Sequence, residues 1–97
     1  RMEKYRSARI AFNSTLEVFP DTEFREEILF MIVKSNFMFA SNSIDSKKAE
    51  RFEETINSYH IFVDSFKNSK HRKIAEGYFN TCLKEIEKLN NLNQNGI

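Results

Sequence analysis

The longest apolar stretch of the chain runs from Phe24 to Ala40 and predicts the helix around which the other segments pack. Six apolar residues stand in a row from Ile28 to Val33 and point to every side of a helix. A helix of this kind is normally buried between neighbours. A strand is an alternative for six residues, but the absence of Gly and Pro up to Ala40 favours the helix. The run is too short to span a bilayer and has charged residues on both sides, so we expect a central helix between flanking helices.

Three further segments place apolar residues at spacings of three and four, which is the period of one helix face. The predicted fold is therefore all-α, with helices over about 2–19, 22–41, 47–66 and 70–90. The apolar stripe of the first helix contains Tyr5, Ala8, Phe12, Leu16 and Phe19. The stripe of the third contains Ala49, Phe52, Ile56, Tyr59, Val63 and Phe66, and that of the fourth contains Ala75, Phe79, Cys82, Ile86 and Leu89.

Short polar breaks separate these segments. Pro20 ends the first helix, because the residue before a proline is pushed out of the helical region. The expected N-caps of the later helices are Asp21 or Thr22, Asp45 or Ser46, and Ser69. Connections this short make neighbouring helices antiparallel. We expect residues 1–90 to form one helical domain and the polar residues 91–97 to form a frayed tail.

The chain also contains an internal repeat. A shift of 47 positions places the first helix on the third, with Tyr5 on Phe52, Ala8 on Thr55, Phe12 on Tyr59, Leu16 on Val63 and Phe19 on Phe66. The segment FPDT then falls on FKNS. Repeats of helix pairs at this scale are typical of a stacked helical array and not of a closed bundle.

Composition narrows the classes of partner. The 97 residues include 15 Lys and Arg and 14 Asp and Glu, so the net charge is +1, with both signs interspersed. A nucleic-acid or anionic-membrane surface would show clustered basic residues, so we expect no nucleic-acid partner. Ten Phe and three Tyr supply large apolar areas, which make a core feasible in so small a domain.

Few residues are candidates for catalysis or metal binding. His60 has no Cys or second His at helical spacing, whereas a zinc site needs three or four good ligands. Cys82 lies on an apolar stripe, where a free Cys is normally a small core residue. The neighbours Glu26 and Glu27, like Glu53 and Glu54, point in different directions on a helix and do not face each other. We therefore expect no enzyme activity, no catalytic or metal-binding residue and no cofactor.

The segment YRSARIAFNSTLEVFPDT resembles the second helix of a tetratricopeptide repeat. The residues that carry the likeness are Tyr5, Ala8, Phe12, Leu16 and Pro20. The segment REEILFMIVKSNFMFA resembles the first helix of the next repeat, through Ile28, Leu29, Ile32 and Ser35. The sequence departs from the pattern at Val33, where Gly or Ala is usual, and at Asn36, where an aromatic residue is usual. The resemblance implies a tetratricopeptide-like antiparallel array of four helices.

Within this superfamily, residues Tyr5 to Glu87 are similar to the C-terminal repeats of the BamD family of outer-membrane protein assembly lipoproteins, in its Bacteroidetes-like form. The likeness rests on the lengthened first helix, the polar turn before ERFEETINSY and the F-x-x-x-F-x-N-S end of that helix. It implies a non-catalytic protein–protein scaffold at the periplasmic face of the bacterial outer membrane. The implied partners are other barrel-assembly subunits, and the implied membrane anchor is an N-terminal lipid outside this segment.

If the second helix begins a repeat, four of its residues line the concave face, where such arrays usually bind partners. These predicted partner-binding residues are Glu27, Phe30, Lys34 and Phe37. The alternative is that a preceding helix of a longer protein covers them, because a large exposed apolar patch indicates a partner or a missing neighbour. In that case we expect a weak homodimer that results from truncation. The alternative function is a free-standing four-helix domain that binds a small ligand or a cell-wall polymer.

Overall fold

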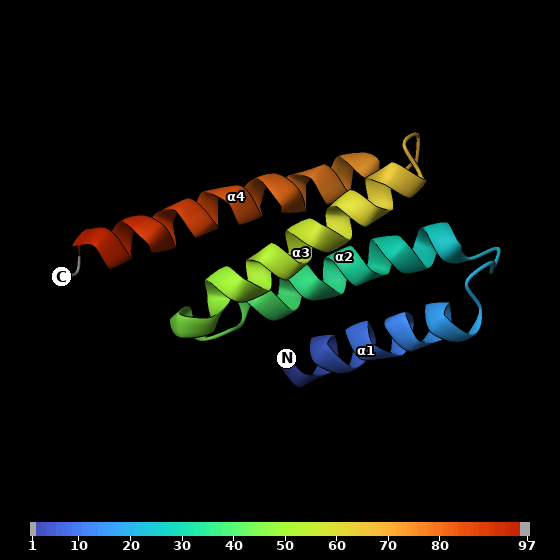
Figure 1. Cartoon of the computed structure of the whole chain (residues 1–97), viewed down its shortest axis with the longest axis horizontal. Helices are drawn as coiled ribbons and strands as arrows, with labels where there is room; N and C mark the ends of the chain where they lie inside the picture. Colours follow the sequence, from blue (N-terminus) through green and yellow to red (C-terminus); the bar gives the residue numbers. More distant parts are fainter. Residues whose placement is uncertain (1, 96–97) are drawn as a thin grey trace.

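The computed structural model describes residues 2–95, with side chains to residue 92, and consists of four α-helices (Figure 1). They are α1 (Met2–Val18), α2 (Arg25–Ser41), α3 (Asp45–Ser65) and α4 (Arg72–Asn95). Each helix runs antiparallel to the one before it. Since the described part of the chain contains no strand, the predicted all-α fold is confirmed.

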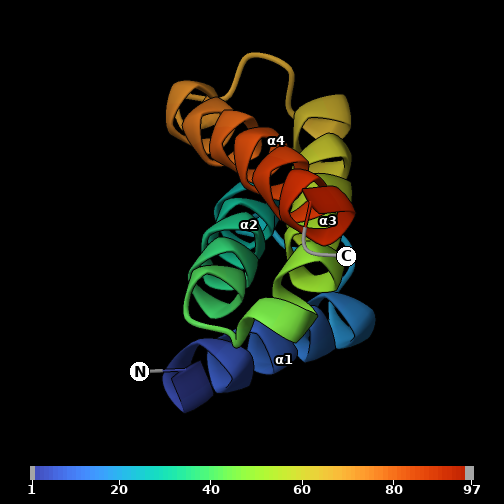
Figure 2. The same cartoon turned by 90° about the vertical axis from the view of Figure 1, so that its left-hand side faces the viewer.

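The helix α2 is the centre of the structure, because it contacts all three other helices (Figure 2). Eight of its residues are buried: Leu29, Phe30, Ile32, Val33, Ser35, Asn36, Phe39 and Ala40. Full burial of a large apolar side chain contributes about 1.5–3 kcal/mol. Neighbouring helices provide this burial. Within residues 2–95, no helix has both the length and the apolar character needed to cross a bilayer.

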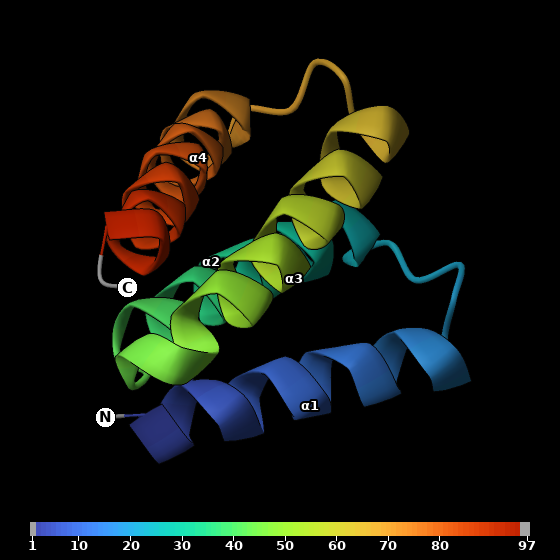
Figure 3. The ribbon, with the colours of Figure 1, turned by 60° about the vertical axis from the view of Figure 1, so that its left-hand side comes forward.

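The four helices form an open array and not a closed bundle. The helix α1 packs on α2 alone, whereas α4 packs on both α3 and α2. Over the described residues, the backbone of α1 approaches neither α3 nor α4. Figure 3 shows α1 at one edge of the molecule and α4 at the other. The overall dimensions of 50 × 28 × 18 Å fit stacked helix pairs, because a closed bundle would bring the first and last helices together.

Two clusters of buried side chains follow α2 and join it to α3 and α4. The first contains Leu29, Phe30, Ile32, Val33, Tyr59, Phe62 and Ala75, and the second contains Ala40, Phe52 and Cys82. Tyr59 stacks on Phe79 of α4, with ring centroids 4.5 Å apart. The helix α1 has no fully buried residue and adds only the partly buried Phe12 and Leu16 to the first cluster. It is therefore the least firmly held of the four helices.

The 47-residue repeat recurs in the backbone hydrogen bonds of the two turns that precede α2 and α4. The donors in the first turn are the N–H groups of Phe19, Thr22, Phe24, Arg25 and Ile28, and those in the second are the N–H groups of Phe66, Ser69, His71, Arg72 and Ala75. Each turn contains a hydroxyl that accepts the N–H two residues later, Thr22 Oγ1 at 3.2 Å and Ser69 Oγ at 3.1 Å. The ends of α1 and α3, and the starts of α2 and α4, are also 47 positions apart. The predicted internal repeat is confirmed as a repeat of backbone geometry.

The helix α1 begins at the predicted position 2, whereas the starts of α2, α3 and α4 differ from the predicted ones by two or three residues. The helix α2 begins three residues after position 22, because the hydroxyl of Thr22 stabilises the turn before the helix and not its first turn. Its N-cap is Phe24, which makes no capping hydrogen bond with its side chain. The N-cap of α3 is Ile44, and Asp45 is the first helical residue. Ser69 likewise lies in the turn before α4, so the predicted N-cap positions were wrong.

The helix α4 continues to Asn95, five residues beyond its predicted end at position 90. The expected frayed tail was therefore wrong for residues 91–95, and residues 96–97 lie outside the described residues. No Gly or Pro stands between Tyr78 and Asn95, so the helical hydrogen bonds can propagate once the helix has formed. The side chain of Leu89 packs on the second cluster and connects this part of α4 to the core.

Replacing Phe62 by Ala should lower the free energy of unfolding by about 3–5 kcal/mol. Phe62 is fully buried, and its ring centroid lies 5.9 Å from that of Phe30, so truncation leaves a cavity in the first cluster. The adjacent Ile61 is 54% exposed, and its replacement by Ala should change stability by about 0.5 kcal/mol. Urea titrations measure both values, and equal losses would contradict this orientation of α3.

Candidate binding groove

Two of the predicted partner-binding residues, Phe30 and Phe37, lie under the second turn and α4. Phe30 is 8% exposed, and its ring stacks on His71 at a centroid distance of 4.4 Å. Phe37 is half-buried and stacks on Tyr78 at 4.6 Å. The expectation that both rings are exposed was wrong, because α4 folds back over α2. The residues that cover them belong to the described chain and not to a preceding helix.

The other two predicted residues, Glu27 and Lys34, lie on the exposed side of α2. Glu27 is tied to the second turn, because His71 Nε2 donates to Glu27 Oε2 at 2.8 Å and Lys70 Nζ lies 3.8 Å from Glu27 Oε1. Among the side chains that the structure describes, Lys34 makes no ion pair. The four residues do not form one exposed surface, and partner binding by Glu27 and Lys34 stays a prediction.

The contact with His71 also changes the acidity of Glu27. The hydrogen bond from His71 is the largest cause that lowers the pKa of the Glu27 carboxyl below its ordinary value of 4.5. Burial acts in the opposite direction, and the charges of His71 and Lys70 lower the pKa further. The ionised carboxylate therefore links α2 to the second turn.

The first and second turns have the same pattern of backbone hydrogen bonds but differ in what covers their side chains. Phe19 and Phe24 are 63% and 60% exposed, whereas their counterparts Phe66 and His71 pack against the first cluster and against Phe30. Of the two turns, the first is therefore the one with exposed aromatic side chains. The weak homodimer stays a prediction, but burial of Phe30 and Phe37 removes them as a reason for it.

A hollow remains where α1 and α3 flank α2, and we call it the α1–α3 groove. Its floor is one stripe of α2 that contains Leu29, Ile32, Asn36 and Phe39. Its walls are Met2, Glu3, Arg6, Arg9 and Asn13 of α1 and Glu50, Arg51, Glu54, Asn57, Ser58 and Ile61 of α3. Two hollows of about 480 and 160 Å³ lie along this groove, and Arg9 and Glu54 line both of them. The groove lies where the backbones of α1 and α3 stay apart.

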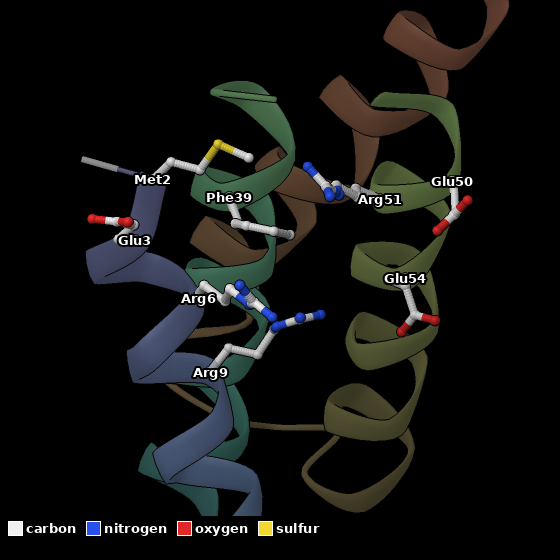
Figure 4. A pocket seen from close by; sticks show the side chains of 8 residues that line it. All are labelled: Met2, Glu3, Arg6, Arg9, Phe39, Glu50, Arg51 and Glu54. Carbon is white, nitrogen blue, oxygen red and sulfur yellow. The ribbon is translucent and has the colours of Figure 1, made fainter. Parts of the chain in front are cut away.

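Three guanidinium groups reach into the wider end of the groove (Figure 4). Arg6 and Arg9 extend from α1, and Arg51 extends from α3 toward Phe39. Glu3 points away from this space. The Cζ atoms of Arg9 and Arg51 lie 4.9 and 4.4 Å from the centroid of the Phe39 ring. At these distances cation–π attraction holds both side chains over the ring.

Hydrogen bonds fix one of these arginines further. Arg51 Nη1 donates to Ser43 Oγ at 2.8 Å, and the same hydroxyl donates to the carbonyl oxygen of Phe39 at 2.7 Å. None of the ion pairs between described side chains includes Arg6, Arg9 or Arg51. Arg9 and Arg51 are therefore held in place over Phe39. Glu3, Glu50 and Glu54 line the same end of the groove, but among the described side chains none of them forms an ion pair with an arginine.

Two buried polar atoms along the groove make no hydrogen bond with the described protein atoms, Arg9 Nε and Asn36 Oδ1. Asn36 is 5% exposed and belongs to the groove floor. A buried polar atom without a partner costs about 1–3 kcal/mol, and such atoms are uncommon in folded proteins. One of the two atoms is a donor and the other is an acceptor. A ligand that satisfies both must offer an acceptor and a donor.

Sequence reasoning missed this groove. The helical period assigned Arg6 and Arg9 to the polar side of the first helix, and Asn36 was only a departure from a repeat pattern. The available signal was Asn36, because an amide inside an all-round apolar helix is costly unless it has a partner. The period within one helix cannot show that residues of α1 and α3 face each other.

The remaining candidate residues have structural roles. Cys82 is fully buried in the second cluster, as expected, and burial raises the pKa of its thiol to about 12. His60 is exposed and makes an edge contact with Phe79 at 5.4 Å. In the part of the chain that the structure describes, no three His, Cys, Asp or Glu side chains gather in a way that could hold a metal ion.

No model of a known protein family matches the chain, and a comparison with curated proteins finds no relative. The tetratricopeptide-like and BamD-like character therefore rests on the motifs quoted above and stays a prediction. What the chain binds has to be argued from its own helices and from the groove between them.

Replacing Glu27 by Gln should lower stability above pH 4.5, and the difference from the unchanged protein should disappear as the pH falls. A carboxyl whose pKa is lower in the folded state stabilises the folded protein at pH values above its pKa in the unfolded chain. This stabilisation is lost as the pH falls through the pKa of the folded state. Urea titrations from about pH 3 to pH 7 test this. The matched control is Glu26→Gln, and a loss that does not depend on pH would contradict the role of the charge.

Cys82 should react with iodoacetamide at pH 8 about a thousandfold more slowly in the folded protein than in urea. The thiolate is the reactive form, and a pKa of about 12 leaves very little of it at this pH, whereas the ordinary value is 9.0. Mass spectrometry of quenched samples measures the two rates. Rapid labelling of the folded protein would contradict the packing of α4 on α2 and α3.

Proposed function

We propose that the chain is a non-catalytic protein–protein scaffold that binds a segment of a partner protein in the α1–α3 groove. The observation that carries this proposal is the pair of buried polar atoms along the groove, Arg9 Nε and Asn36 Oδ1, which make no hydrogen bond with the described protein atoms. A partner that supplies an acceptor and a donor would remove the cost of leaving them unpaired. Stacked helical arrays commonly use extended surfaces of this kind to bind other proteins.

The length of the groove favours an extended chain over a compact ligand. It follows α3 from Glu50 to Ile61, and eleven helical steps of about 1.5 Å give a length of about 16 Å. An extended peptide spans about 3.3 Å per residue, so about five residues fit. The polar side chains of the walls can bind the main chain of such a segment, whereas Leu29 and Ile32 on the floor are already buried. The alternative of a small ligand or cell-wall polymer gains no such support.

The more specific proposal is a tetratricopeptide-like array that works with barrel-assembly subunits at the periplasmic face of the outer membrane. The first part is supported by the 47-residue repeat of helix ends and turn hydrogen bonds, since stacked helix pairs characterise such arrays. The second part is supported by the sequence resemblance between Tyr5 and Glu87. Membrane attachment would then come from an N-terminal lipid and not from the helices described.

A photo-crosslinking amino acid at position 61 should capture a partner from outer-membrane extracts, and the same group at position 83 should not. Ile61 lies in the groove wall and Leu83 lies on α4, outside the groove. Their side chains are 54% and 47% exposed, so the two sites are matched for access. Mass spectrometry then identifies the captured protein.

Capture of a barrel-assembly subunit at position 61 alone would support the whole proposal. Equal capture at both positions, or capture at neither, would contradict binding in the α1–α3 groove. Specific capture of a protein from another process would leave the scaffold function in place and contradict the outer-membrane role.

A further inference from the structure

We infer that the partner segment is acidic, with a carboxylate side chain among Arg6, Arg9 and Arg51 and a neighbouring main-chain N–H donated to Asn36 Oδ1. The inference rests on the proposed function and adds the chemistry of the segment to it. Two independent observations carry it, the arginines at the wide end of the groove and the unpaired amide oxygen on its floor.

The first observation is a cluster of guanidinium groups that have no ion-pair partner among the described side chains, although Glu50 and Glu54 line the same end of the groove. Two guanidinium groups share the ring of Phe39, and Arg6 points into the same space (Figure 4). Charges of the same sign at this separation repel each other. A carboxylate between them replaces this repulsion with charge-assisted hydrogen bonds, which are about twice as strong as neutral ones. Since Arg51 is already anchored to Ser43, it loses little freedom on binding.

The second observation selects a peptide over a free carboxylate ion. Asn36 Oδ1 needs a donor, and an ionised carboxylate has only acceptor oxygens. Each residue of a peptide other than proline carries one N–H donor and one carbonyl acceptor. The main chain of a bound segment can therefore pair with Asn36 and with Arg9 Nε, while its acidic side chain meets the guanidinium groups.

The test uses fluorescein-labelled octapeptides of alternating Ala and Asp, with binding measured by fluorescence anisotropy. Two further peptides replace every Asp by Asn, which is neutral and of the same shape, or by Lys. The Ala–Asp peptide should bind at least about tenfold more tightly than the Ala–Asn peptide, because only a carboxylate makes charge-assisted hydrogen bonds. This advantage should shrink when salt is raised to about 1 M, and the Ala–Lys peptide should not bind.

Replacing Arg6 by Gln should weaken binding of the Ala–Asp peptide about tenfold and weaken binding of the Ala–Asn peptide much less. Arg6 is exposed and forms no ion pair with the described side chains, so its replacement should leave the fold intact. The matched control is Lys73→Gln, which removes one positive charge from the exposed surface of α4. Equal effects of the two variants would overturn the inference, because they would indicate attraction by net charge alone.

Replacing Asn36 by Leu tests the second contact. This variant should weaken binding of both the Ala–Asp and the Ala–Asn peptide, since the main-chain N–H loses its acceptor. Its melting temperature should stay the same or rise, because the substitution removes a buried polar atom that has no partner in the protein. A lower melting temperature with unchanged binding would show a structural role for Asn36 and overturn this contact.

The outcomes separate the inference from the proposed function. If the Ala–Asp and Ala–Asn peptides bind equally well and Asn36→Leu weakens both, the groove binds peptides and the acidic preference is wrong. If inorganic phosphate displaces the Ala–Asp peptide and Asn36→Leu has no effect, the site takes a free anion and the inference is also wrong. If no peptide binds and crosslinking at position 61 fails, the proposed function fails with the inference.

Discussion

A helix that is apolar on every side is stable in water only when protein covers it, and α2 imposes this condition on the whole chain. Its eight buried residues need neighbours in several directions, and α1, α3 and α4 supply them. The connections between consecutive helices span six, three and six residues, so each helix must turn back on the one before it. The antiparallel order therefore follows from the short connections, and the central place of α2 follows from its apolar surface.

The α1–α3 groove is a consequence of the same arrangement. Three helices do not close around a fourth, and the stripe of α2 between α1 and α3 is left under a hollow. At this stripe the sequence changes from Leu29 and Ile32 to Asn36, although an apolar residue would cost less in the free protein. Residues that break a local rule of stability tend to occur at functional sites. The guanidinium groups of Arg9 and Arg51 at the same groove are consistent with such a site.

The sequence was sufficient to predict the four helices, the central place of α2 and the 47-residue repeat, because these follow from period, breakers and internal similarity. It could not predict which side of α2 is covered by which helix, since an all-round apolar helix carries no directional signal. For this reason Phe30 and Phe37 were placed on an open surface, whereas α4 and His71 cover them. The groove combines residues such as Arg9 and Arg51 from helices that are not adjacent in the sequence, and only their packing on α2 brings them together.

Hydrogen exchange of individual backbone amides, followed by NMR, tests most directly whether α2 holds the structure together. The amides of α2 should exchange most slowly, through global unfolding, because three helices cover this helix. The amides of α1 should exchange faster, through an opening that leaves α2, α3 and α4 packed, because α1 contacts α2 alone and has no fully buried residue. Exchange of the α2 amides at the rate of the α1 amides would contradict the central role of α2.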